Sequence, residues 1–239
     1  MTTGIVVALP EELSTLTSKK INKGCCVFIT DGIVLAYSGA GTNNARIASE
    51  LLIAKGATQL ISWGCAAALS ETLKPGDLVL AESLTDSEGT QFGIHPDWHS
   101  YAKNLLSTTL EVHVGSLVES HCIVATGKDK KQLNIQTGAI ALDMESIAIA
   151  KVARQHQLLF LAIRAIADPV NMDLPKAINH SINTEGDIVL SELLLFVARH
   201  PTELPGLIKL GLHFNAAKNT LKSAAMQLDQ LIALPRLAL

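Results

Sequence analysis

The feature that most constrains the fold of this chain is the alternation of strand-like and helix-like segments along its first 200 residues. Short apolar runs predict strands over 4–8, 24–30, 32–38, 58–63, 77–82, 112–118, 121–125 and 158–166. Apolar residues at three- and four-residue spacing predict helices over 43–55, 97–107, 144–156 and 187–199. This alternation is typical of an α/β fold, in which helices cover a central, largely parallel or mixed sheet.

The end of the chain follows a different pattern. Apolar residues recur there at alternating three- and four-residue steps, at Leu207, Leu210, Phe214, Ala217, Leu221, Ala224, Leu228 and Leu231. We expect one α/β domain over residues 1–200 and an amphipathic helical extension over residues 201–239. The apolar stripe of such a helix can pack on the domain or on a second subunit. With lysines beside this stripe, the helix could also bind in a groove or lie on a membrane surface.

Composition narrows the classes of partner. The net charge is −3, and Lys and Arg are spread along the chain, which disfavours nucleic-acid binding. No run approaches the roughly 20 apolar residues of a spanning helix, although 48% of the residues are hydrophobic. The N-terminus has no signal-peptide pattern. We therefore expect a cytoplasmic protein, with contact to the inner face of the membrane left open by the helical extension.

The metal-ligating residue types are poorly placed for a metal. The four cysteines, which include the adjacent Cys25 and Cys26, show no paired-ligand spacing and suggest reduced thiols. His95 and His99 have no third ligand at suitable spacing, so we interpret them as part of a rim or surface loop. We expect neither a metal nor an organic cofactor.

Carboxylates stand at the ends of three predicted elements. Glu12 follows the first strand, Asp143 and Glu145 open an apolar helix, and Asp168 ends the strand that contains Arg164. Each has a structural alternative: Glu11 and Glu12 suit a helix N-terminus, Asp143 an N-cap, and Asp168 a turn before Pro169. Because these carboxylates occur together with two glycine turns, we expect Glu12, Glu145 and Asp168 to line one cavity.

The glycine turns join strands to the segments that follow. In the first, backbone amides near Gly39 and Gly41 are expected to hold an anion or a sugar hydroxyl at a helix N-terminus. A dinucleotide fingerprint is disfavoured, because Asn44 stands where the third glycine belongs. The second turn, Gly64-Cys65-Ala66, lets a ligand approach the backbone, although a structural turn explains its small residues almost as well.

The order of these motifs resembles the nucleoside phosphorylase and nucleosidase superfamily over about residues 4–170. The resemblance rests on Glu11-Glu12, Ser38-Gly39-Ala40-Gly41, Trp63-Gly64-Cys65 through Asp77, Asp143-Met144-Glu145, and Arg164 through Asp168. Residues 141–146 and the helical tail are most similar to the hopanoid-biosynthesis-associated phosphorylase branch. That resemblance implies a homo-oligomer, such as a dimer, that releases adenine from a nucleoside with a bulky apolar 5′-group, such as adenosylhopane.

The resemblance also implies residue roles. Asp168 would protonate the purine, Glu12 would activate water, and Glu145 would bind the ribose hydroxyls and stabilise the cationic sugar. The substrate would also contact Asp143, Met144, Gly64, Cys65 and Ala66, with Gly39, Gly41 and Cys65 on the side of the nucleophile.

Three departures keep alternatives open. Cys65 stands where many relatives have serine, Ala67-Ala68 replaces a glycine pair, and the segment 127–132 lacks the aromatic that stacks the base in the methylthioadenosine nucleosidases. Without the serine hydroxyl, and with Glu12 present, hydrolysis is favoured over phosphorolysis. Phosphorolysis and a non-catalytic nucleoside- or lipid-binding module remain the alternatives.

Overall fold

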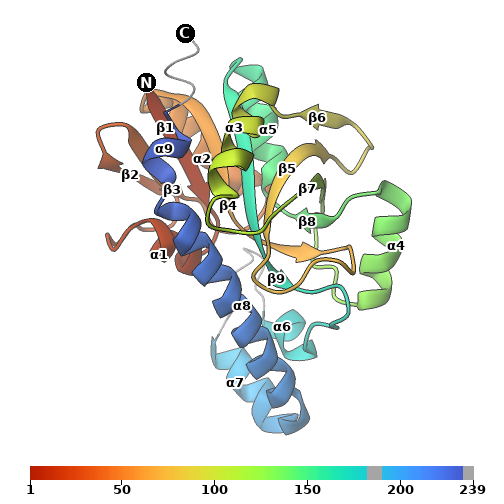
Figure 1. Ribbon diagram of the computed structural model, residues 1–239. Helices are drawn as coiled ribbons and strands as arrows, with labels where there is room; N and C mark the ends of the chain where they lie inside the picture. The colour runs from red at the N-terminus through yellow and green to blue at the C-terminus, as the bar shows by residue number, and fades with distance from the viewer. Residues whose placement is uncertain (182–189, 234–239) are drawn as a thin grey trace.

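The computed structural model describes residues 1–181 and 190–233, which form a mixed sheet flanked by helices (Figure 1). The strands are β1 (Thr2–Val7), β2 (Cys25–Thr30), β3 (Ile33–Tyr37), β4 (Ala57–Ala68), β5 (Leu78–Thr85), β6 (Gln91–Gly93), β7 (Val112–Glu119), β8 (Ala141–Asp143) and β9 (Leu159–Asp168). The helices are α1 (Pro10–Leu16), α2 (Thr42–Ala54), α3 (Pro96–Leu106), α4 (Gly127–Thr137), α5 (Ser146–Gln155), α6 (Lys176–Ser181), α7 (Leu190–Arg199), α8 (Leu204–Ala225) and α9 (Leu228–Leu231), with a 3-10 turn, η1, at Pro201–Glu203. The α/β fold expected from the alternation is confirmed.

The strands run in the order β2-β3-β1-β4-β8-β7-β5-β6, and β9 pairs with both β4 and β5. The pairings β4–β8–β7–β5–β9–β4 form a closed circuit, so this half of the sheet curls into a barrel while β1, β2 and β3 extend it on one side. Strands β1, β4 and β9 are mutually parallel across the sheet. Their carboxyl ends therefore meet at one edge, which brings distant parts of the sequence together.

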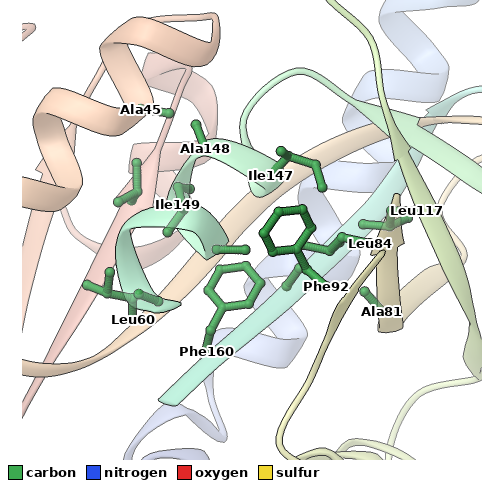
Figure 2. Close-up of a cluster of buried hydrophobic side chains, with 14 of the residues drawn as sticks. Ala45, Leu60, Ala81, Leu84, Phe92, Leu117, Ile147, Ala148, Ile149 and Phe160 are labelled. Carbon is green, nitrogen blue, oxygen red and sulfur yellow. The ribbon is translucent and has the colours of Figure 1, made fainter. Parts of the chain in front are cut away.

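Apolar side chains pack on both faces of the sheet. On one face, α2 and α5 cover a cluster that includes Leu60, Phe92, Ile147 and Phe160 (Figure 2). On the other face, α1, α3, α8 and α9 cover a second cluster that includes Trp63. Both faces of the central strands are buried, which explains why those strands are apolar almost throughout rather than alternating.

The second half of α8 packs on the sheet. Ala217, Leu221 and Ala224 of α8 are buried in the second cluster, and Trp98 of α3 donates a hydrogen bond to the carbonyl of Leu231 at 2.9 Å. The beginning of α8 projects with α6 and α7 away from the body of the domain (Figure 1). No described helix combines the length and the apolar character needed to span a bilayer.

Several predicted elements need correction. Residues 121–125 form no strand but an irregular segment, and α5 begins at Ser146 because residues 141–143 pair as β8. Strand β4 runs on to Ala68, since β8 and β9 continue to supply partners. Helix α6 forms after β9, whereas residues 182–189, and with them the start of the helix expected over 187–199, lie outside the described residues.

Helix α4 was not predicted from the sequence, because it has no stripe of apolar residues. Its ends nevertheless carry capping residues: Thr126 accepts a hydrogen bond from the amide of Asp129 at 3.1 Å, and Gly138 ends the helix at φ 70°. The caps rather than the pattern of apolar residues were the signal for this helix in the sequence. Helix α1 and strand β6 were also not predicted, and both are short.

Candidate active site

A cavity of about 650 Å³ lies where β1, β4, β8 and β9 end, and α8 forms part of its wall. Its volume is within the range of about 300–1,000 Å³ typical of small-molecule sites. Seven of the residues expected to form the site line it: Glu12, Cys65, Ala66, Asp143, Met144, Glu145 and Asp168. Gly39, Gly41 and Gly64 do not line it, but each is next in sequence to a residue that does, Ala40 or Cys65.

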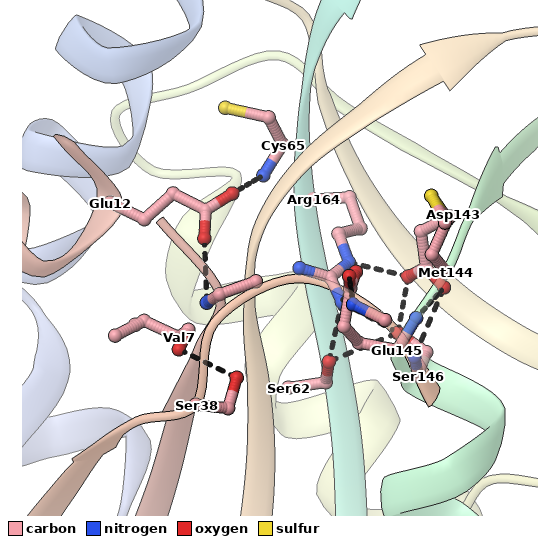
Figure 3. Close-up of polar contacts among 12 residues, drawn as sticks. Val7, Glu12, Ser38, Ser62, Cys65, Asp143, Met144, Glu145, Ser146 and Arg164 are labelled. Carbon is pink, nitrogen blue, oxygen red and sulfur yellow. Dashed lines mark hydrogen bonds and ion pairs between the residues drawn. The ribbon is translucent and has the colours of Figure 1, made fainter. Parts of the chain in front are cut away.

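Glu12 is held rigidly at the start of α1. Pro10 begins this helix directly after β1, and Glu12 Oε2 accepts hydrogen bonds from the amides of Ala8 and Leu9 at 2.9 and 3.0 Å. Oε1 accepts a third bond, at 2.8 Å, from the amide of Cys65 on β4 (Figure 3). Glu12 thus caps its own helix, as the structural alternative expected, and also faces the cavity. The side chain is locked because both oxygens have donors.

Arg164 is the buried cation between the glutamates, and sequence reasoning gave it no role. It lies on β9 directly opposite Gly64 of β4, and only 1% of it is exposed. A Cβ atom at Gly64 would lie 2.5 Å from Glu12 Oε1 and would also collide with Arg164 Nη1. Gly64 therefore makes the room that lets the guanidinium approach Glu12.

A buried polar network fixes Arg164. Its Nε donates to Asp143 at 2.6 Å, and its Nη2 donates to the hydroxyls of Ser62 and Ser146 at 2.6 and 3.0 Å (Figure 3). Asp143 also accepts bonds from the amides of Glu145 and Ser146. Asp143 thus caps the start of α5 and orients the arginine, so its carboxylate is fully engaged with protein donors although it borders the cavity.

Glu145 lies at the same network's edge. Its Oε1 accepts a hydrogen bond from the amide of Gly41 at 2.9 Å, and its Oε2 is 4.0 Å from Arg164 Nη2. Thr42 at the start of α2 also donates to the carbonyl of Met144. The first glycine turn therefore holds the Met144-Glu145 segment in place, and the Gly41 amide expected to bind an anion is bonded to Glu145 instead.

Burial controls the protonation of the two glutamates. The pKa of Glu145 is raised to about 7, because desolvation, helped by the nearby Asp143 and Glu12, outweighs the lowering by Arg164 and by the Gly41 amide. Burial also raises the pKa of Glu12, against Arg164 and the three amides that bind it. Glu12, Glu145 and Arg164, called here the glutamate side, thus combine two acids and one cation in a buried environment.

Asp168 also lines the cavity, at the end of β9. The register of β4 and β9 shifts between Ala66 and Ala67, so β9 bulges just before Asp168. Lys130 of α4 approaches to 2.6 Å from its Oδ1. Burial raises the pKa of Asp168, and Lys130 opposes that rise. We call Asp168 and Lys130 the aspartate side; nothing in the sequence pattern pointed to Lys130.

The remaining wall is mostly apolar. Ile123 and Val124, in the segment expected to be a strand, line it together with Leu174. Leu210 and Phe214 of α8 complete it. The helical extension therefore contributes directly to the cavity, next to its polar centre.

Other candidate groups are less suited to chemistry. Burial, with Glu12 and Glu11, raises the pKa of the Cys65 thiol well above its usual value, so this sulfur stays protonated and is a poor nucleophile. His95 is exposed at the start of α3, and neither it nor His99 lines the cavity. Within residues 1–181 and 190–233, no three His, Cys, Asp or Glu side chains gather closely enough to hold a metal ion.

Comparison with known proteins gives consistent matches. A family model described as "Phosphorylase superfamily" matches residues 2–191. A 5′-methylthioadenosine/S-adenosylhomocysteine nucleosidase of Staphylococcus epidermidis is 29% identical over 197 residues, which cover 70% of this chain and 86% of that protein. The solved nucleosidase of the same name from Neisseria meningitidis has a TM-score of 0.72 at 20% identity, covering 96% of this chain and 99% of the other. Futalosine hydrolase of Helicobacter pylori has a TM-score of 0.70 at 17% identity, covering 97% of each chain.

Proposed function

Because the chain belongs to the phosphorylase superfamily, we propose that it hydrolyses the N-ribosyl bond of a purine nucleoside and releases adenine from an adenosine-type substrate. The observation that carries the proposal is that Glu12, Glu145 and Asp168, which come from three separate parts of the sequence, line one cavity. The nucleosidases and the hydrolase among its relatives act by name on nucleosides, which supports the same reaction.

Asp168 is proposed as the general acid. Breaking the N-ribosyl bond leaves negative charge on the departing purine, and a proton delivered to its N7 neutralises that charge. A carboxyl group can deliver it only if the carboxyl is neutral beforehand. The burial that raises the pKa of Asp168 favours this neutral form.

Glu145 is proposed to bind the sugar. An ionised carboxylate accepts hydrogen bonds from the ribose 2′- and 3′-hydroxyls and stabilises the positive charge that develops on the ring. The Gly41 amide and Arg164 favour its charged form and fix its direction. Met144, beside it on the cavity wall, would pack against the sugar.

Glu12 is proposed as the base that activates water. Its two oxygens are anchored by three amides, which leaves lone pairs on a fixed carboxylate that borders the cavity. The guanidinium of Arg164, next to Glu12 at Gly64, would help to hold the water and the developing charge. A base and an acid on different sides of the sugar suit direct displacement by water.

The apolar wall supports a substrate with a bulky apolar 5′-group, such as adenosylhopane. Leu210 and Phe214 offer contact area for such a group. On α8, Leu204, Ile208 and Leu212 form a stripe at four-residue spacing with 48%, 57% and 65% of each residue exposed. We propose that this stripe contacts the inner face of the membrane, from which a lipid-tailed nucleoside would enter.

An assay of base release with varied phosphate tests the reaction. We expect adenine and free ribose derivatives from adenosine, methylthioadenosine or adenosylhopane at equal rates with and without phosphate. Strict dependence on phosphate and a ribose 1-phosphate product would instead favour phosphorolysis. Saturable binding without base release would favour the non-catalytic module.

Two further measurements test the proposed oligomeric state and the proposed membrane contact. Light scattering of the purified protein distinguishes a monomer from the proposed homo-oligomer, such as a dimer. Sedimentation with anionic vesicles tests the proposed membrane contact. A monomer that stays in the supernatant would contradict both proposals and leave the catalytic one standing.

A further inference from the structure

Lys130 is a buried cation whose three ammonium protons all have acceptors. Its side chain is 0% exposed. Its Nζ donates to Asp168 Oδ1 at 2.6 Å, to the carbonyl of Met172 at 2.9 Å and to the carbonyl of Pro169 at 3.2 Å. Burying an ammonium is unfavourable unless it is paired and fully bonded, so this geometry is a built site rather than a chance contact.

The neighbouring lysines of α4 show that this placement is specific. Lys128 and Lys131 are exposed, and Lys131 pairs with the exposed Glu71 at 2.6 Å. Helix α4 thus directs one of its lysines inward to the end of β9 and leaves the flanking ones in solvent. Lys131 therefore provides a matched control for Lys130.

The pair leaves one oxygen of Asp168 without a donor among the described residues. Oδ1 accepts from Lys130, and no described group donates to Oδ2. Asp168 borders the cavity, so Oδ2 is the oxygen available to a ligand. Lys130 therefore fixes which oxygen can carry and transfer a proton.

We propose that Lys130 is a positioning residue that directs Asp168 Oδ2 at the departing base and stabilises the carboxylate formed when the proton leaves. The inference rests on the proposed function. In the step, the Oδ2 proton passes to purine N7 and the electron pair of the N-ribosyl bond goes to the purine. Water forms the new bond to the sugar and gives one proton to Glu12, which later releases it to solvent. Lys130 keeps all its protons, and solvent reprotonates Asp168 after the products leave.

The energetic reason is that the bond from Lys130 differs between the two states of Asp168. An ammonium binds a neutral carboxyl oxygen less strongly than a carboxylate, so the bond strengthens as the proton is transferred. The same charge lowers the pKa of Asp168 against the effect of burial. Lys130 therefore favours the transfer and also limits the pH range in which the acid is protonated.

Among the residues that the structure describes, Lys130 is the one charged group that acts appreciably on the pKa of Asp168, where it opposes the effect of burial. The other titratable side chains that line the same cavity are Glu11, Glu12, Lys23, Tyr37, Cys65, Cys122, Asp143 and Glu145, and α4 also carries Lys128, Asp129 and Lys131.

The experiment replaces the charge and titrates the acid. In Lys130→Met we expect the pKa of Asp168, followed by carbon-13 NMR of labelled aspartate and assigned with Asp168→Asn, to rise by about one unit or more. The alkaline limb of adenine release should move up in pH by the same amount, and the plateau kcat should fall roughly tenfold. In Lys131→Met, both readouts should match the wild type.

Two further variants keep the test decisive if Lys130→Met folds poorly. Lys130→Gln removes the charge but keeps donors, and should also raise the pKa of Asp168, whereas Lys130→Arg should leave it near the wild-type value. An unchanged pKa in a folded neutral variant would overturn the proposal. A wild type that releases no base would defeat the proposed function instead, because the carboxyl titration needs no turnover.

Discussion

The glutamate side and the aspartate side of the cavity stabilise their buried carboxyl groups with different cations. On the glutamate side, one arginine lies near two glutamates and is fixed by Asp143, Ser62 and Ser146. On the aspartate side, one lysine serves one acid and two backbone carbonyls. An arginine can bridge several groups because its planar fork has five donors, whereas an ammonium acts as a point charge. A shared arginine suits Glu12 and Glu145, which must be ionised at the same time. A lysine paired with a single acid suits Asp168, which must lose a proton and regain it in each turnover.

The largest effect is expected from Asp168→Asn. The amide cannot deliver a proton, so kcat for adenine release should fall by about 10²–10⁴-fold. Steady-state kinetics would measure the loss, and Asp31→Asn in the exposed turn between β2 and β3 is the control. If Asp168→Asn turned over substrate at the wild-type rate, Asp168 would not be the general acid.

Glu12→Gln should lower kcat by about 10²-fold, because the amide keeps most of the shape but cannot take a proton from water. Nucleoside binding measured by calorimetry should change little. Glu88→Gln, in the exposed turn between β5 and β6, should behave like the wild type. If both substitutions had the same small effect, Glu12 would only be the cap of α1.

Arg164→Met tests the shared cation through stability. The substitution leaves Asp143 and Glu145 buried without their partner, so the free energy of unfolding should fall by about 3–5 kcal/mol. Urea unfolding at pH 7 measures it, with Arg154→Met on the surface of α5 as the control. A loss below about 1 kcal/mol would mean that the network does not hold the glutamate side together.

The two sides should also appear as two limbs in the pH profile. Activity should fall as the pH drops through about 7, the pKa of Glu145, and should also fall as the pH rises through the raised pKa of Asp168. The pKa of Glu145 is raised on folding, so its contribution to stability is greatest below its unfolded value and is lost as the pH rises toward 7. Urea unfolding between pH 5 and 8 should show this decline in the wild type and a flatter dependence in Glu145→Gln.

The smallest effect on the domain is expected at the exposed stripe of α8. Ile208→Ser with Leu212→Ser should change the free energy of unfolding by about 0.5 kcal/mol or less and leave adenosine turnover intact. Vesicle binding and turnover of a lipid-tailed nucleoside should fall. If the variant turned over both adenosine and the lipid-tailed nucleoside at the wild-type rates, the stripe would have no role in substrate binding.

Much of this arrangement could be predicted from the sequence. Apolar runs of strand length and helical spacing depend on local residue patterns, which is why most strands and the α2, α3, α5 and α8 helices were predicted near their observed positions. Acids that follow apolar strands could be identified in the same way. Strand β8 could not, because three residues carry no periodicity and the strand exists only through its pairing with β4 and β7.

Hydrophobic periodicity and chain order are local properties, so they were enough to predict the α/β class and the acids at the strand ends. Which cation pairs with which acid depends on the tertiary structure. Gly64 faces Arg164 through strand register, and Lys130 reaches Asp168 through the docking of a polar helix. These contacts join residues far apart in the chain, and their energies depend on a burial that no local pattern specifies.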